Sequence, residues 1–262
     1  MSIVFSAISP HSPILVQSIG KENTNRLSAT LNSIKKLESS LIESKPDTIF
    51  IISPHGSVQN NSFTMNLSPK FTGTFEEFGD HSTTLKYKGD FGLAYKIRER
   101  LETKAPLQLM SNEKLDYGSL VPISLLTQKL PNLKIIPIYY SGLSHQEHFD
   151  FGVLLQRELI YNNERIAVVA SGDLSHSLSK DSPAPYSSKG KKFDAKLIEY
   201  LKKNDIDSIL KMKETLIKEA NECGLKSILI LQGILSKIKH DPKMLSYEHP
   251  FGVGYLVMNF IL

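Results

Sequence analysis

Two histidines of this chain occur in the same short setting, a Ser-Pro-His tripeptide that follows an apolar run. The runs are residues 3–8 and 47–52, and the two tripeptides end at His11 and His55. Proline donates no hydrogen bond to a sheet and does not continue a helix, so each run is predicted to be a strand that ends at its tripeptide. Both imidazoles are therefore expected just beyond the carboxyl end of a strand.

A third histidine has an equivalent place. Residues 165–170 form another apolar run, and Ser-Gly-Asp-Leu-Ser leads from this run to His176. In open α/β sheets, ligands bind outside the carboxyl ends of the strands, where loops from different strands converge. One histidine at a strand end is more often a hydrogen-bonded structural residue. Three of them, two with matching flanks, favour a shared site over histidines that merely cap strands.

Two imidazoles and one anionic group make a metal site with open coordination positions. On ferrous iron this set binds substrate and dioxygen together, and zinc on the same ligands acts as a Lewis acid or activates water. The segment 219–224, Glu-Ala-Asn-Glu-Cys-Gly, is the best source of the third ligand because it precedes a predicted helix, whose N-terminus favours an anion. The alternative is that Glu222 caps this helix and that Cys223 is a buried, inert thiol.

The elements that must position these residues alternate between strand and helix, which indicates a mostly parallel sheet with helices on both faces. Residues 57–88, rich in Thr, Asn, Phe and Gly, are expected to form loops or irregular strands. His145 and His148 lie in a polar stretch and are expected to be exposed. Apolar runs predict further strands at 133–139 and 252–261, and apolar residues three and four apart predict helices at 27–41, 90–101, 118–130, 195–203, 206–212 and 224–238.

Composition places the chain among ordinary globular proteins. Of its 262 residues, 40% are hydrophobic and 22% are charged, and we expect one domain over residues 1–262. The net charge of +4 comes mainly from lysines between Lys180 and Lys243 that alternate with acidic residues, which predicts a solvated surface and no nucleic-acid partner. Cys223 is the only cysteine, and the sequence has neither a signal peptide nor an apolar run of about 20 residues. A cytoplasmic location without membrane partners is expected.

Several short motifs, taken in order, resemble those of one family. From about residue 3 to 260, the chain is similar to the catalytic B subunit (LigB) of class III extradiol ring-cleavage dioxygenases, and to its relatives, the Memo proteins and AmmeMemoRadiSam system protein B. The ordered set is far more specific than any single motif. The motifs are Ser-Pro-His-Ser-Pro at 9–13, Ser-Pro-His-Gly at 53–56, Leu-Asp-Tyr-Gly-Ser-Leu-Val-Pro at 115–122, Ser-Gly-Asp-Leu-Ser-His at 171–176, Glu-Cys-Gly at 222–224 and Pro-Phe-Gly-Val-Gly-Tyr at 250–255.

The resemblance implies the α/β architecture of these dioxygenases, which is shared with phosphorylases and hydrolases: a central, mostly parallel mixed sheet flanked by helices on both faces. It also implies that His11 and His55 hold the metal. The third ligand would be Glu222, a carboxylate as in the dioxygenases, or Cys223, a cysteine as in the Memo proteins. Glu222 is the preferred candidate and Cys223 the next.

The resemblance further implies that His176 is the active-site base. Tyr117 stands where ring-cleaving members carry a histidine, and a tyrosine, with a reference pKa of about 10, is a poor base near neutral pH. Tyr117 is therefore expected to steady the substrate or the bound oxygen. Asp173, His81 and His249 are expected to bind substrate.

The implied function is extradiol cleavage of a catechol- or aminophenol-type substrate by dioxygen at a non-heme Fe(II) centre, an oxidoreductase reaction that incorporates two oxygen atoms. Zinc or another divalent metal is the alternative to iron, and a homo-oligomer or a small partner subunit is left open. Cys223 and Tyr117 favour a second reading, a Memo-like protein for metal binding, redox regulation or interaction without ring cleavage. A zinc hydrolase on the same scaffold lacks support, because the sequence has no Gly-x-Ser-x-Gly motif.

Overall fold

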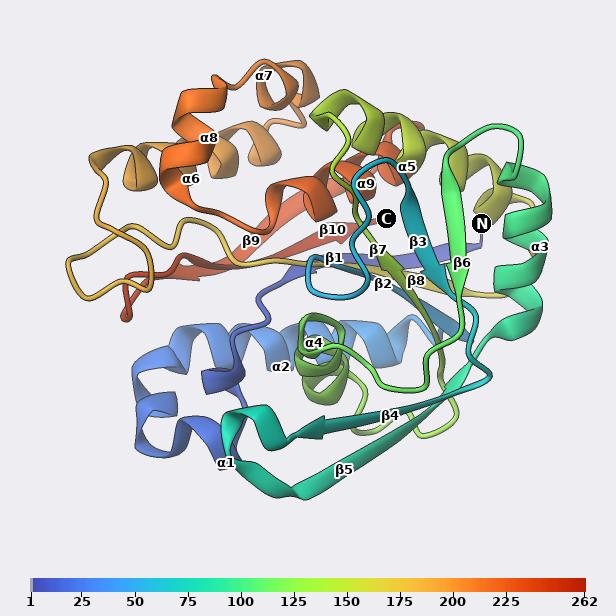
Figure 1. Cartoon of the computed structure of the whole chain (residues 1–262), viewed down its shortest axis with the longest axis horizontal. Coiled ribbons are helices and arrows are strands. Elements are labelled where there is room, and N and C mark those ends of the chain that lie inside the picture. The colour runs from blue at the N-terminus through green and yellow to red at the C-terminus, as the bar shows by residue number, and fades with distance from the viewer. Residues whose placement is uncertain (1) are drawn as a thin grey trace.

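The computed structural model describes residues 2–262, which form a ten-stranded sheet with helices on both faces (Figure 1). The strands are β1 (Ile3–Ser9), β2 (Thr48–Ser53), β3 (Phe63–Asn66), β4 (Lys70–Phe75), β5 (Asp80–Gly89), β6 (Leu107–Met110), β7 (Lys134–Tyr139), β8 (Ile166–Ser171), β9 (Asp241–Glu248) and β10 (Tyr255–Ile261). The helices are α1 (Gln17–Gly20), α2 (Ser28–Glu43), α3 (Phe91–Leu101), α4 (Tyr117–Leu126), α5 (His145–Ile160), α6 (Ser188–Lys202), α7 (Ile206–Leu210), α8 (Glu214–Ala220) and α9 (Leu225–Leu235).

Four parallel strands form the centre of the sheet, in the order β7-β2-β8-β1. All residues of β2 and β8 are buried, as expected for strands that are covered on both faces. Ser9 at the end of β1 pairs with Ser171 at the end of β8, and Ile52 of β2 pairs with Ala170 of β8. The carboxyl ends of the three histidine-bearing strands therefore lie side by side.

Side chains that alternate along these strands enter two separate cores. Phe50 and Ile52 of β2 join the core beneath α3, α5 and α6 to α9, whereas Ile49 and Ile51 join the core beneath α2 and α4. Figure 1 shows these two groups of helices on opposite faces of the sheet. The α/β fold class predicted from the sequence is confirmed.

The outer strands make the sheet mixed. β10 is antiparallel to β1, β9 is antiparallel to β10, and β4 and β5 form an antiparallel pair. β3 is antiparallel to β7 and parallel to β6. The prediction of loops or irregular strands at 57–88 was thus incomplete, because β3, β4 and β5 are regular strands in this segment. None of the helices in residues 2–262 is long and apolar enough to cross a membrane.

The expectation that His148 is exposed was wrong. His148 lies on the first turns of α5 and is fully buried, and its ring accepts a hydrogen bond from the Ser141 backbone (3.2 Å) and contacts the Ser144 carbonyl (2.7 Å). Burial lowers the pKa of His148 to about 4, so the ring is neutral at physiological pH. It is a structural histidine that ties the start of α5 to the loop after β7. His145 is half-buried.

Candidate metal centre

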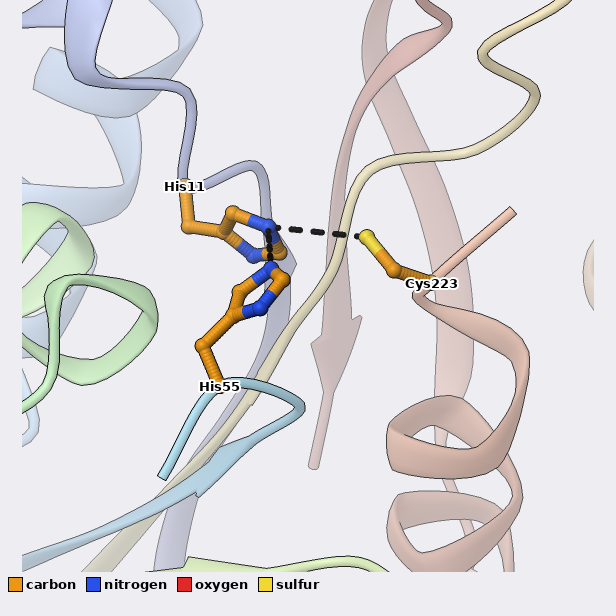
Figure 2. Close-up of side chains that lie close together, drawn as sticks. All are labelled: His11, His55 and Cys223. Atoms are coloured by element: carbon orange, nitrogen blue, oxygen red, sulfur yellow. Dashed lines mark hydrogen bonds between the residues drawn. The ribbon is translucent and has the colours of Figure 1, made fainter. Parts of the chain in front are cut away.

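Three side chains from three different segments meet at the carboxyl edge of the sheet (Figure 2). His11 follows β1, His55 follows β2, and Cys223 lies between α8 and α9. The Nε2 atoms of the two histidines are 2.9 Å apart, and the Cys223 Sγ is 3.5 Å from the His11 Nε2. One nitrogen or sulfur atom from each side chain lies within 4.8 Å of the other two.

These separations fit a metal ion held by all three side chains. Two imidazole nitrogens that share an ion at about 2.0–2.1 Å are about 2.9–3.4 Å apart, and a thiolate at about 2.3 Å from the same ion lies about 3.5 Å from each nitrogen. Two unprotonated nitrogens as close as those of His11 and His55 repel each other unless a proton or a cation lies between them. The arrangement therefore suits a cation, and three protein ligands leave further coordination positions open.

Hydrogen bonds around Ser171 select the tautomer of His11. The Ser171 hydroxyl donates its only proton to the Gly118 carbonyl, so it must accept at its 3.0 Å contact with the His11 Nδ1. Burial, followed by the charge on His55, lowers the pKa of His11 well below its usual value, and the ring is neutral. A neutral imidazole with its proton on Nδ1 has its lone pair on Nε2. That lone pair faces His55 and Cys223.

Replacing Ser171 with alanine is expected to lower metal affinity about 10- to 100-fold, the usual cost of losing a group that orients a metal-bound histidine. Without the acceptor oxygen, the His11 proton is free to move to Nε2 and block the lone pair. Metal titration against a competing chelator measures the effect. Ser6→Ala is the matched control, because Ser6 is also a buried serine of the sheet and its hydroxyl, among residues 2–262, bonds only the Phe260 carbonyl. Equal affinities for the two variants would contradict the role of Ser171.

His55 is held by the start of α4. Its backbone N–H donates to the Ser53 hydroxyl (3.2 Å), which in turn donates to Asp116 (2.5 Å), the residue that caps α4. The ring of Tyr117 stacks on the His55 ring, with centroids 4.4 Å apart. Burial lowers the pKa of His55, an effect that Asp116 opposes. The Ser53 hydroxyl, the Asp116 cap and the Tyr117 ring thus hold the neutral His55 imidazole so that it faces His11.

Cys223 reaches the histidines because two loops touch through glycine. A β-carbon on Gly172, directly after β8, would overlap the Cα of Gly224, so only glycine allows this approach. The Cys223 backbone N–H and its thiol both lie close to the Asp173 carbonyl, at 3.4 and 3.6 Å. Burial raises the pKa of the Cys223 thiol well above its usual value. A bound metal ion would displace the thiol proton, as it does from other coordinating thiols.

Glu222, which the sequence favoured as the third ligand, is not in the group of close ligand atoms that His11, His55 and Cys223 form. Its carboxylate accepts a hydrogen bond from the Leu225 backbone N–H (2.6 Å) and caps α9, the alternative that the sequence left open. Burial raises the pKa of Glu222 to about 7. The geometry therefore favours Cys223 over Glu222, the reverse of the order preferred from sequence. The physical reason is that adjacent side chains of this turn point in different directions.

His176 and Asp173 lie next to the three candidate ligands. The His176 backbone N–H donates to the Ala220 carbonyl (3.0 Å), and the charge that His176 carries when protonated is close enough to lower the pKa values of His11 and His55. Asp173 accepts a hydrogen bond from the His11 backbone (3.1 Å), and its second oxygen is 4.0 Å from the His11 Nε2. Burial raises the pKa of Asp173 to about 7. Asp173 therefore supports His11 directly, whereas the sequence suggested a role in substrate binding.

A cavity of about 300 Å³ opens beside His55 and Tyr117. Sequence reasoning missed most of its lining, which includes Tyr139 from the end of β7 together with Asn112 and Lys114. No motif marks these residues, because they belong to a strand end and an irregular loop. His81 and His249, which the sequence placed in the pocket, are exposed and do not line this cavity. His81 is an exposed residue of β5, and His249 follows β9 near Tyr247.

Asp194 of α6 fixes the loop that carries His176. One carboxylate oxygen accepts from the Ser175 backbone N–H (2.9 Å), and the other accepts from the Tyr247 hydroxyl (2.6 Å). The side chain is 1% exposed, and burial raises its pKa to about 6. The folded chain therefore holds the Asp194 proton to a higher pH than the unfolded chain does.

Replacing Asp194 with asparagine is expected to flatten the pH dependence of stability. In the wild type the unfolded carboxyl ionises near pH 3.8 and the folded one near 6, so its favourable contribution is complete below 3.8 and is lost as the pH rises to about 6. The loss is about 3 kcal/mol at 1.36 kcal/mol per pKa unit. The asparagine oxygen can still accept from the Ser175 N–H, and its NH2 group can donate to the Tyr247 hydroxyl, so two contacts are retained without the ionisation. Denaturant unfolding between pH 4 and pH 7 tests this, and parallel curves for the two proteins would refute it.

The fold and this site together define an α/β protein with a candidate His-His-Cys metal centre at the carboxyl edge of its sheet. Residues 6–258 match the family described as the catalytic LigB subunit of aromatic ring-opening dioxygenase, and the chain belongs to this family. The resemblance seen in the sequence is thus confirmed.

Two further comparisons show what this chain is similar to. A Clostridium acetobutylicum protein is 30% identical over 259 residues, which cover 95% of this chain and 55% of the relative, so this chain spans about half the length of that relative. The crystal structure of an uncharacterized Escherichia coli K12 protein superposes with a TM-score of 0.68 over 98% of this chain and 99% of that chain. At 14% identity, this second likeness concerns the fold alone.

Proposed function

We propose that this chain opens the ring of a catechol- or aminophenol-type substrate with dioxygen, at a ferrous centre held by His11, His55 and Cys223. The single observation that carries the proposal is the convergence of these three ligands in a chain of the ring-opening dioxygenase family. Ferrous iron there would supply open positions for the two adjacent heteroatoms of the substrate and for dioxygen. Both oxygen atoms would enter the product, a 2-hydroxymuconic semialdehyde in the case of catechol.

His176 would take a proton from the substrate. Burial lowers its pKa, so the ring is neutral near pH 7 and has a free lone pair. Within residues 2–262 its buried Nδ1 has no hydrogen-bond partner, and the proposal requires a substrate hydroxyl to reach one of the ring nitrogens. A positioned base near neutral pH is what deprotonation of a phenol requires.

Tyr117 would orient the substrate as a hydrogen-bond donor. Burial, followed by the negative charges of Cys223 and Asp173, raises its pKa further above the usual value, so the hydroxyl keeps its proton. Its ring is held between His55 and Phe78, with centroids 4.4 and 5.3 Å away. The adjoining cavity of about 300 Å³ lies at the lower end of the size range of small-molecule sites and suits a substrate with one ring.

Anaerobic loading with ferrous iron, followed by oxygen uptake with a series of catechols and aminophenols, tests the proposal. We expect consumption of one dioxygen per substrate and the new visible absorbance of a ring-opened product. Stoichiometric iron binding without oxygen uptake across the series would contradict ring cleavage.

A second candidate function rests on the thiol. Dioxygenases of the non-heme ferrous class use a carboxylate as the anionic ligand, whereas a thiolate favours copper(I) or zinc. Cys223 therefore supports a Memo-like role in metal binding or redox regulation without ring cleavage. Competition among iron, copper and zinc for the purified protein, with elemental analysis, separates the two functions.

Cys223 must also stay reduced in order to bind a metal ion. This requirement for a reducing environment supports a cytoplasmic location.

A further inference from the structure

A second cavity, of about 610 Å³, lies among α6, α7 and α8 and is lined by five lysines: Lys189, Lys192, Lys196, Lys211 and Lys213. Figure 1 shows these three helices grouped at one end of the molecule. The lining residues, all within the described chain, include no Asp or Glu. The cavity is therefore a concave surface of one charge sign, which attracts anions.

Several acidic residues on or beside the same helices are already paired, one of them with a lysine of the cavity. Glu199 pairs with Lys203 (2.7 Å), Glu219 pairs with Lys189, and Asp205 caps α7 through the Ser208 N–H (3.1 Å). The other four lysines of the cavity have no carboxylate within 4.0 Å among residues 2–262. Glu199 and Asp205 act on Lys196 and Lys211 only at longer range, so the repulsion among the lysines is offset in part, and a bound anion would relieve it further.

The floor of the cavity is apolar. Met212 and Leu216 are 8% and 9% exposed, and the ring of Tyr200 lies half-buried beside them. Lys196 donates a hydrogen bond to the Tyr200 hydroxyl (3.1 Å), and its ammonium group lies 5.5 Å from the centre of that ring. One of the cationic groups is thus held in place above an aromatic surface. A ligand that matches this lining has an anionic part and an apolar or ring-shaped part.

We propose that this lysine-lined cavity binds an organic phosphate, with its phosphate groups at the lysines and its ring on Tyr200, Met212 and Leu216. Lysine binds phosphate as a compact point charge, and several lysines together suit a di- or triphosphate. The volume lies within the range of small-molecule sites. The site is separate from the metal centre and does not depend on the proposed ring opening.

Calorimetric titration of the metal-free chain with ATP, without added Mg²⁺, tests the site. We expect saturable binding that weakens as the salt concentration rises, because added salt screens charges at the protein surface. Inorganic triphosphate is expected to bind more weakly than ATP, since it cannot use the floor. No saturable binding of ATP would overturn the proposal, and equal affinities for the two probes would overturn the role of the floor.

Two double variants test whether ATP binds at the lysines of this cavity. The double variant Lys192→Gln and Lys211→Gln is expected to bind ATP at least about tenfold more weakly. Both side chains are exposed, so the variant should fold normally, which its melting temperature checks. Lys35→Gln with Lys36→Gln on α2 is the matched control, because it removes the same charge from another exposed pair. An equal loss of ATP affinity in the two double variants would mean a general charge effect and would overturn the site. Binding of polyglutamate in preference to ATP would also overturn it.

Discussion

Replacing Cys223 with serine is expected to lower the affinity of the chain for its metal ion by more than about 100-fold. The reason is that Cys223 supplies the anionic member of the ligand set, and even groups that only orient a ligand cost 10- to 100-fold when they are lost. A serine hydroxyl is a neutral, weaker donor that does not ionise near pH 7. Competitive titration with a chromogenic chelator under anaerobic conditions measures the change.

Glu222→Gln is the matched control for Cys223→Ser. A glutamine oxygen can still accept the Leu225 N–H that Glu222 accepts at 2.6 Å, so the cap of α9 is kept. Metal affinity close to that of the wild type is expected. If Glu222→Gln lost the metal and Cys223→Ser kept it, the carboxylate would be the ligand, and the arrangement described for this turn would be wrong.

Replacing His176 with alanine is expected to reduce kcat for ring cleavage by about 10²- to 10⁴-fold, the usual contribution of a positioned acid or base. Metal affinity should be unchanged, because His176 is outside the group of three ligand side chains. Steady-state oxygen uptake gives kcat, and chelator titration gives the affinity. This prediction rests on the proposed ring-opening function.

His81→Ala is the control for His176→Ala, because His81 is exposed on β5 and does not line the cavity beside His55. It is expected to leave both kcat and metal affinity unchanged. Full turnover in His176→Ala would remove His176 from the mechanism. A loss of metal in that variant would instead indicate a structural role in the loop that Asp194 holds.

The central sheet could be predicted from sequence because its strands are short, mostly apolar and bounded by proline or glycine. The Ser-Pro-His repeats marked the ends of β1 and β2, and the structure brings His11 and His55 together as expected. The choice between Glu222 and Cys223 could not be made from sequence. It depends on the contact between Gly172 and Gly224, residues that are distant in the chain, and on which side chain caps α9.

Among the elements that the sequence patterns did not predict, α5 and β9 were missed for different reasons. α5 begins with a capping box, Ser144 and Glu147, which is a sequence signal for a helix start, and this signal was overlooked because the stretch looked polar. β9 has no comparable signal, since it is a half-exposed edge strand whose mixed residues show no apolar run. Its position follows from pairing with β10, a contact that local sequence patterns do not encode.

X-ray absorption at the metal edge of the anaerobically loaded protein tests the ligand set most directly. We predict one sulfur scatterer at about 2.3 Å and two imidazole nitrogens at about 2.0–2.1 Å, and loss of the sulfur shell in Cys223→Ser. A first shell made only of nitrogen and oxygen in the wild-type protein, unchanged in Cys223→Ser, would contradict a metal centre of His11, His55 and Cys223.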